Sequence, residues 1–189
     1  FAIMSALLHR QQTGQGQWID FAMYQIGVST IGDKLLDFVA NKRNGQVMGN
    51  AHEYYAPHNV YPSKGEDRWI AIGTENDSQW HALCEVMGNP DWCLLDEYSD
   101  SFSRLKNRES LDSLISDWTS SYDNNELTDT LQSKGIPAGP VMNSKDLLLD
   151  QHLKDRGFYE VITHNSSDNI GKQIYSSRGW QMSNAQVKI

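Results

Sequence analysis

Histidine is the residue type in this chain best suited to acid–base or carboxylate-binding chemistry. Two of the six histidines, His52 and His58, fall within the stretch Arg43–His58, where Gly45 and Gly49 permit positive φ and break regular periodicity. A histidine on such a loop can titrate near neutral pH and contact a carboxylate substrate, and we consider His52 the stronger of the two. The simpler alternative is a solvent-exposed loop residue. The other four histidines have no evident partner in the pattern.

Other patterns that could perform chemistry favour structural explanations. The glycines in Thr13–Gln17 follow a predicted helix and precede an extended segment, whereas a phosphate-binding loop needs strand, glycines and then a helix N-terminus. No histidine, cysteine or carboxylate pair stands at convincing zinc-ligand spacing, so we expect no metal. Serine and histidine occur without a nucleophile elbow, which gives a hydrolase no support. We assign Trp69, Trp80 and Trp118 to the core and not to a ligand platform.

Composition limits the class of protein. The chain has 189 residues, 39% of them hydrophobic and 21% charged, which is typical of a folded globular protein. A net charge of −8 argues against nucleic acid as a partner. Only Cys84 and Cys93 are present; we expect Cys84 to be buried, and so few cysteines favour a reducing cytoplasm. No apolar run approaches the roughly 18 residues of a membrane span.

The elements that position these residues can be read from periodicity, caps and turns. Gly14 and Gly135 stand where helices end, and Asp20 is placed to cap the following helix. The predicted helices are Ala2–Thr13, Ala22–Lys42, Asp77–Gly88, Arg108–Tyr122, Glu126–Lys134 after a cap in Asp123–Asn125, and a last one capped by Asn143 or Ser144. The predicted extended segments are Gln17–Phe21, Asn59–Pro62, Arg68–Gly73, Ile136–Met142, and a hairpin of Phe158–His164 and Gln173–Ser177 across the turn Asn165–Gly171. We therefore predict an α+β fold, a small antiparallel or mixed sheet packed with helices and preceded by long connecting helices.

Several literal strings are more specific than these patterns. They are Thr13-Gly14-Gln15-Gly16-Gln17-Trp18-Ile19-Asp20, Gly49-Asn50-Ala51-His52 leading to Val60-Tyr61-Pro62, Trp69-Ile70-Ala71-Ile72-Gly73, and Gly135-Ile136-Pro137-Ala138-Gly139-Pro140-Val141 with the residues up to Phe158. In this order they resemble the family III coenzyme A transferases, which include formyl-CoA and carnitine CoA-transferases and the related 2-methylacyl-CoA racemases. The resemblance runs over nearly the whole chain and is centred on the family's small domain.

The resemblance implies a reaction. The family's transferases move coenzyme A (CoA) from an acyl-CoA to a carboxylic acid through an aspartate that forms a mixed anhydride and then a thioester. That aspartate lies upstream of the segment that opens this chain, so we expect a fragment or truncated relative that is inactive alone and holds no catalytic residue. CoA would be a substrate and not a tightly bound cofactor. An acyl-CoA racemase or epimerase, and a non-enzymatic dimerisation or partner-binding module, remain alternatives.

The resemblance also implies a site and an assembly. Gly49, Asn50 and His52 align with a segment that the family brings towards its active site, and we predict that they bind substrate. We expect an interdomain helical segment at 1–45, the α+β small domain at 46–175, and a segment at 176–189 leading back to a large domain. The two N-terminal helices carry more apolar surface than their own domain is expected to cover, so we predict a homodimer built through residues 1–42.

Overall fold

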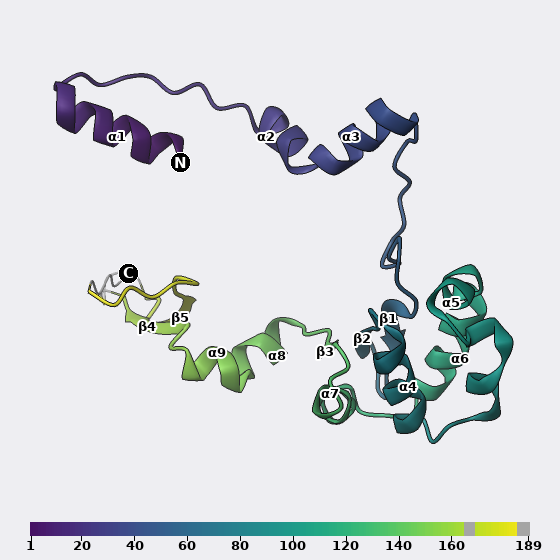
Figure 1. Cartoon of the computed structure of the whole chain (residues 1–189). Helices are drawn as coiled ribbons and strands as arrows, with labels where there is room; N and C mark the ends of the chain where they lie inside the picture. Colours follow the sequence, from purple (N-terminus) through teal and green to yellow (C-terminus); the bar gives the residue numbers. More distant parts are fainter. Residues whose placement is uncertain (165–168, 185–189) are drawn as a thin grey trace. The chain divides into compact units, whose positions relative to one another are not determined.

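The structure is a computed structural model that describes residues 1–164 and 169–184. The chain divides into two compact units, Phe1–Gly49 and Asn50–Ile189. Figure 1 follows the elements along the chain, from the purple helices of the first unit to the green and yellow elements of the second. Within the described residues, no helix combines the length and apolar character that crossing a membrane requires.

The first unit contains three helices, α1 (Ala2–Thr13), α2 (Met23–Thr30) and α3 (Gly32–Asn41). The bounds of α1 and its stop are confirmed, because Gly14 is left-handed at φ 73° and its amide donates to the Arg10 carbonyl. The single helix predicted over Ala22–Lys42 is wrong: it breaks at Ile31, directly before Gly32, a residue that disfavours helix interiors. The predicted capping role of Asp20 is also wrong, since α2 begins after Ala22 without a side-chain cap.

The second unit is built around a small antiparallel sheet, which confirms the α+β class. Its strands are β1 (His58–Pro62), β2 (Trp69–Gly73) and β3 (Ala138–Pro140), in the order β1-β2-β3. The third strand is shorter than the predicted Ile136–Met142. It lies between Pro137 and Val141, whose backbone groups continue the hydrogen bonding to Gly73 and Trp69 at its two ends.

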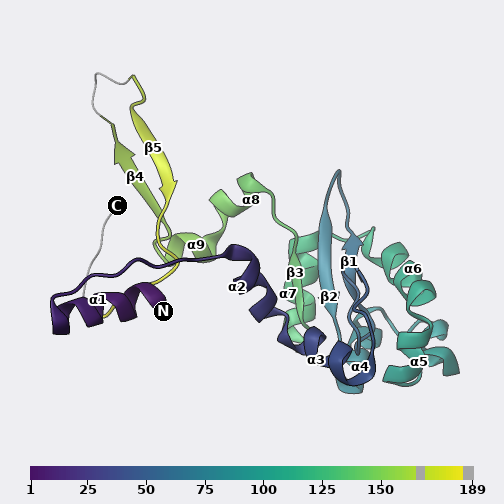
Figure 2. The ribbon, with the colours of Figure 1, turned by 90° about the horizontal axis from the view of Figure 1, so that it is seen from above.

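Helices surround this sheet, and Figure 2 shows β1, β2 and β3 with α4, α6 and α7 next to them. They are α4 (Asp77–Val86), α5 (Ser101–Lys106), α6 (Arg108–Thr119) and α7 (Asn124–Ser133). The cap predicted before α7 is confirmed, because the Asp123 side chain accepts from the Asn125 and Glu126 amides. The short helices η1 (Asp91–Leu94) and η2 (Asp96–Tyr98), and α5 itself, were not predicted.

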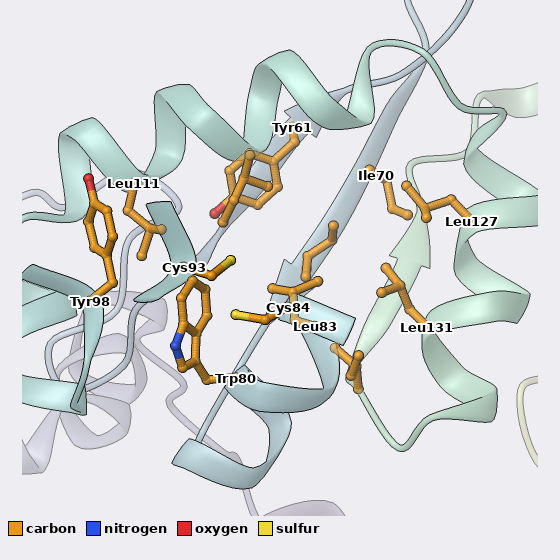
Figure 3. Packing of buried hydrophobic residues seen from close by; sticks show 13 residues of the cluster. Tyr61, Ile70, Trp80, Leu83, Cys84, Cys93, Tyr98, Leu111, Leu127 and Leu131 are labelled. Atoms are coloured by element: carbon orange, nitrogen blue, oxygen red, sulfur yellow. The ribbon is translucent and has the colours of Figure 1, made fainter. Parts of the chain in front are cut away.

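The core lies between the sheet and these helices. Figure 3 shows Trp80, Leu83 and Cys84 of α4 packed with Cys93 and with residues of β2, α6 and α7. The burial of Cys84 and Trp80 is confirmed, and Trp118 is partly buried against the same cluster. Trp69 is 39% exposed, contrary to prediction, because alternate residues of a strand face opposite sides and the buried side of β2 is taken by Ile70 and Ile72.

The rest of the second unit forms two short helices and a hairpin: α8 (Ser144–Leu149), α9 (Gln151–Asp155), β4 (Tyr159–Thr163) and β5 (Lys172–Ser176). Of the two predicted caps, Asn143 and Ser144, the structure has Asn143, in a reciprocal capping box with Asp146 that was not predicted. The hairpin is antiparallel as predicted, although residues 165–168 of its predicted turn lie outside the described residues.

Candidate functional site

A cluster of four rings forms in the stretch Asn50–His58, which we call the 50–58 loop. The His52 ring stacks on Tyr55, with centroids 4.4 Å apart and planes 16° from parallel. Tyr54 meets His52 edge-on at 5.8 Å, and the His58 ring lies 5.1 Å from that of His52. The loop therefore brings together the two histidines that the sequence singled out, along with two tyrosines that it did not.

Hydrogen bonds select the proton-bearing nitrogen of each histidine. The Tyr54 amide donates to His52 Nδ1 at 3.1 Å, so the His52 proton belongs on Nε2. His58 Nδ1 lies 2.9 Å from the Asn50 carbonyl oxygen, which can only accept, so His58 carries a proton on Nδ1. Within the loop, neither Nε2 takes part in a hydrogen bond. The two imidazoles are therefore adjacent, and each has its Nδ1 in a hydrogen bond.

His58 is the first residue of strand β1, and the sheet holds its backbone in place. His58 pairs with Gly73 of β2, and a Cβ placed on Gly73 would lie 3.1 Å from His58 Cδ2. The imidazole thus lies close against Gly73, where a Cβ would require a shift of a few tenths of an ångström. The backbone just before it is also held, since the Pro57 carbonyl accepts from the Thr74 amide at 2.9 Å.

The three predicted substrate residues have different places in this arrangement. Gly49 closes the first unit with a left-handed backbone at φ 61°. Asn50 opens the 50–58 loop and contributes its carbonyl to His58, and His52 stands inside the ring cluster. Their role in binding stays a prediction. Tyr54 and Tyr55 were missed, although their spacing after His52 in an irregular, glycine-bounded stretch could have indicated a ring cluster.

The remaining candidate groups are less suited to chemistry. Burial raises the pKa of the Cys84 thiol and that of Cys93, so neither favours the reactive thiolate. Among the described residues, no three histidine, cysteine or carboxylate side chains gather as a metal site would require. A separate hollow of about 220 Å³ is lined by Arg68, Asn124 and Asp146 among others, but its Arg68 and Asp146 side chains pair with each other at 2.6 Å.

Comparison with solved structures defines the class of protein. A CAIB/BAIF family protein from Brucella suis superposes on 99% of this chain and 47% of its own, with a TM-score of 0.82 and 26% sequence identity. The α+β domain with its preceding helices is therefore the architecture of that class of proteins.

Sequence comparison gives the family. The profile of CoA-transferase family III matches residues 1–188, and the chain belongs to this family. It is 35% identical over 167 residues to the succinyl-CoA:mesaconate CoA-transferase of Haloarcula marismortui, covering 88% of this chain and 41% of that protein. It is 30% identical over 156 residues to the succinyl-CoA–L-malate CoA-transferase beta subunit of Chloroflexus aurantiacus, covering 82% of this chain and 38% of that one. The chain thus spans less than half the length of these relatives.

Proposed function

We propose that this chain supplies the small domain of an enzyme that moves CoA from an acyl-CoA to a carboxylic acid. Family membership and the two named relatives support this reaction. In it, the donor thioester bond is exchanged for a thioester on the acceptor acid, and the donor acyl group leaves as a carboxylate. CoA is then a substrate and not a resident cofactor.

The acid acceptor is a dicarboxylic acid. Both relatives carry in their names succinyl-CoA and a second acid, mesaconate or L-malate, and each of these acids has two carboxyl groups. A dicarboxylate offers one carboxylate to the transfer chemistry and leaves the other as a negative charge that a binding site can recognise.

The single observation that carries the site is the pair of adjacent imidazoles in the 50–58 loop. His52 holds its proton on Nε2 and is a ready donor to a carboxylate oxygen. His58, anchored through Nδ1, becomes a second donor at Nε2 when it is protonated. Two donors on rings 5.1 Å apart suit the two oxygens of one carboxylate. The remaining groups of the active site, including the acyl-carrying residue, would come from outside this chain.

Two consequences follow for activity and assembly. We expect that the chain by itself does not transfer CoA, because the family resemblance implies that the acyl-carrying aspartate lies outside the segments it matches. It forms a homodimer through residues 1–42, since no described side chain of α1, α2 or α3 is buried. The exposed apolar residues of these helices include Ile3, Leu7, Leu8, Ile26, Leu35, Phe38 and Val39. A clean monomer in light scattering at micromolar concentration would contradict the dimer.

The cytoplasmic location proposed for the protein rests on its two buried free thiols.

The test of the site uses the full-length gene product. His52→Ala and His58→Ala each remove one donor, and a hydrogen bond to a charged group is worth about 1.5–3 kcal/mol, or roughly 10- to 150-fold in affinity. We expect the KM for the acid to rise by that order while the KM for the acyl-CoA donor is unchanged. His81→Ala is the matched control, an exposed histidine of α4. Unchanged kinetics for both loop variants would remove the site from the account.

A further inference from the structure

Arg104 is a buried cation at the base of the candidate site. It lies in α5 with 1% of its side chain exposed, and its guanidinium stands 5.1 Å from the ring centroid of Trp80. Burying a guanidinium is costly unless its N–H groups find acceptors. The acceptors of Arg104 therefore indicate which parts of the chain this side chain holds in place.

Its three donor nitrogens reach three different elements. Nε donates to the Ala56 carbonyl at 3.0 Å, Nη1 to the Tyr98 carbonyl at 3.2 Å, and Nη2 to Asp77 Oδ1 at 2.6 Å. The charge partner, Asp77, is 54% exposed, so solvent shares in neutralising it. The hydrogen bonds to Ala56 and Tyr98 are both buried, but Tyr98 is only 6 residues away, whereas the bond to Ala56 reaches 48 residues back along the chain into the 50–58 loop.

The Ala56 carbonyl is two residues from His58. It also lies within 3.4 Å of the Thr74 hydroxyl, and the next carbonyl, that of Pro57, accepts from the Thr74 amide. The end of the loop therefore receives hydrogen bonds from Arg104 of α5 and from Thr74, the residue after β2. A charged donor on a buried carbonyl is the strongest of these contacts.

We propose that Arg104 is a positioning residue for the 50–58 loop. Its Nε–H fixes the Ala56 carbonyl and so sets the backbone from which His52 and His58 present Nε2 to the acid substrate. The inference rests on the proposed function of that loop. Lysine cannot replace it, since an ammonium has no fixed fork of donors and does not lie flat against Trp80.

The experiment separates positioning from stability with two substitutions of the full-length gene product. Arg104→Lys keeps the charge but loses the fork. Arg104→Met keeps an unbranched side chain but has no hydrogen-bond donor and leaves no buried charge. It therefore tests the loss of the hydrogen bond to Ala56 even if the Arg104→Lys protein does not fold. Leu131→Ala, which removes a fully buried side chain of α7, is the control for lost stability. Each is assayed for the KM of acid and of acyl-CoA, and for amide exchange of the peptide covering residues 50–58.

We expect the Arg104 variants to raise the acid KM about tenfold or more, since small misplacements of a binding group cost up to roughly 100-fold. The donor KM stays constant, and loop amides exchange faster, whereas Leu131→Ala changes neither. In a His52→Ala/His58→Ala background, Arg104→Met adds less than about twofold to the acid KM, because Arg104 acts through these two histidines.

Two results overturn the inference. One is an Arg104→Met protein with wild-type loop exchange and acid KM; the other is a full Arg104→Met effect on the acid KM on top of His52→Ala/His58→Ala. If His52→Ala and His58→Ala leave kinetics unchanged, the proposed site fails instead, and loop exchange alone then decides whether Arg104 holds the loop.

Discussion

Gly73 provides a direct probe of how His58 is held. A Cβ on Gly73 would meet His58 Cδ2 at 3.1 Å and both Cγ and Nε2 at 3.9 Å. A contact of 3.1 Å is tight enough that one of the two groups must shift by a few tenths of an ångström, and we expect the exposed His58 ring to move and weaken its 2.9 Å hydrogen bond to the Asn50 carbonyl. Gly139 on β3 is the matched control, because a Cβ there meets nothing within 4 Å.

The two substitutions should differ by the energy of one hydrogen bond. Replacing a strain-free glycine by alanine stabilises a protein by about 0.4–1 kcal/mol through the unfolded chain, and Gly139→Ala should show this gain. Gly73→Ala has the same gain but loses a hydrogen bond worth about 0.5–1.5 kcal/mol. We therefore expect Gly73→Ala to be less stable than Gly139→Ala by about 0.5–1.5 kcal/mol.

Urea denaturation measures this difference, and NMR of the imidazole nitrogens reports the cause. In the wild type and in Gly139→Ala, neutral His58 should carry its proton on Nδ1, whereas in Gly73→Ala the Nε2-protonated tautomer should appear. Equal stability gains in both variants, with His58 still protonated on Nδ1, would show that the ring does not lie where the contact places it.

Two further predictions concern the polar contacts that join helices to the sheet. Tyr61→Phe removes a 2.6 Å hydrogen bond from a buried hydroxyl to Asp112 of α6, so urea denaturation should show a loss of about 1.5–3 kcal/mol, and a loss near zero would contradict it. The hydrogen bond from Arg68 lowers the pKa of Asp146, so this carboxylate contributes stability that is present above its ordinary value of 3.8 and is lost as pH falls through the lowered value. Asp146→Asn should accordingly lower the Tm at about pH 7, and the difference from the wild type should shrink as the pH falls below the ordinary value of 3.8; a pH-independent difference would refute the linkage.

Local signals made much of the fold predictable. Gly14 and the caps at Asp123 and Asn143 each act within one helical turn, so a short window of sequence contains the whole interaction. The alternation in β2 likewise indicated a strand, although it did not say which face would be buried, and Trp69 was placed on the wrong one.

The features that could not be predicted depend on contacts between distant parts of the chain or on closely balanced local propensities. Nothing near Arg104 in the sequence indicates that it reaches Ala56, 48 residues away. The break at Ile31 depends on a balance between weak helix propensities that periodicity does not resolve. For the candidate site, His52 could be proposed from its loop and its family resemblance, whereas the pairing with His58 required the hydrogen bond that returns the chain to Asn50.

The proposed CoA transfer is tested most directly by incubating the full-length gene product with an acyl-CoA donor and a dicarboxylic acid in D₂O. The thioesters are then analysed by mass spectrometry. We predict a new thioester of the acceptor acid, formed with loss of the donor thioester and without deuterium at the carbon next to the carbonyl. A 2-methylacyl-CoA that gains deuterium at that carbon, with no new thioester, would identify a racemase instead and contradict the central claim. No change in any thioester would favour a non-enzymatic module.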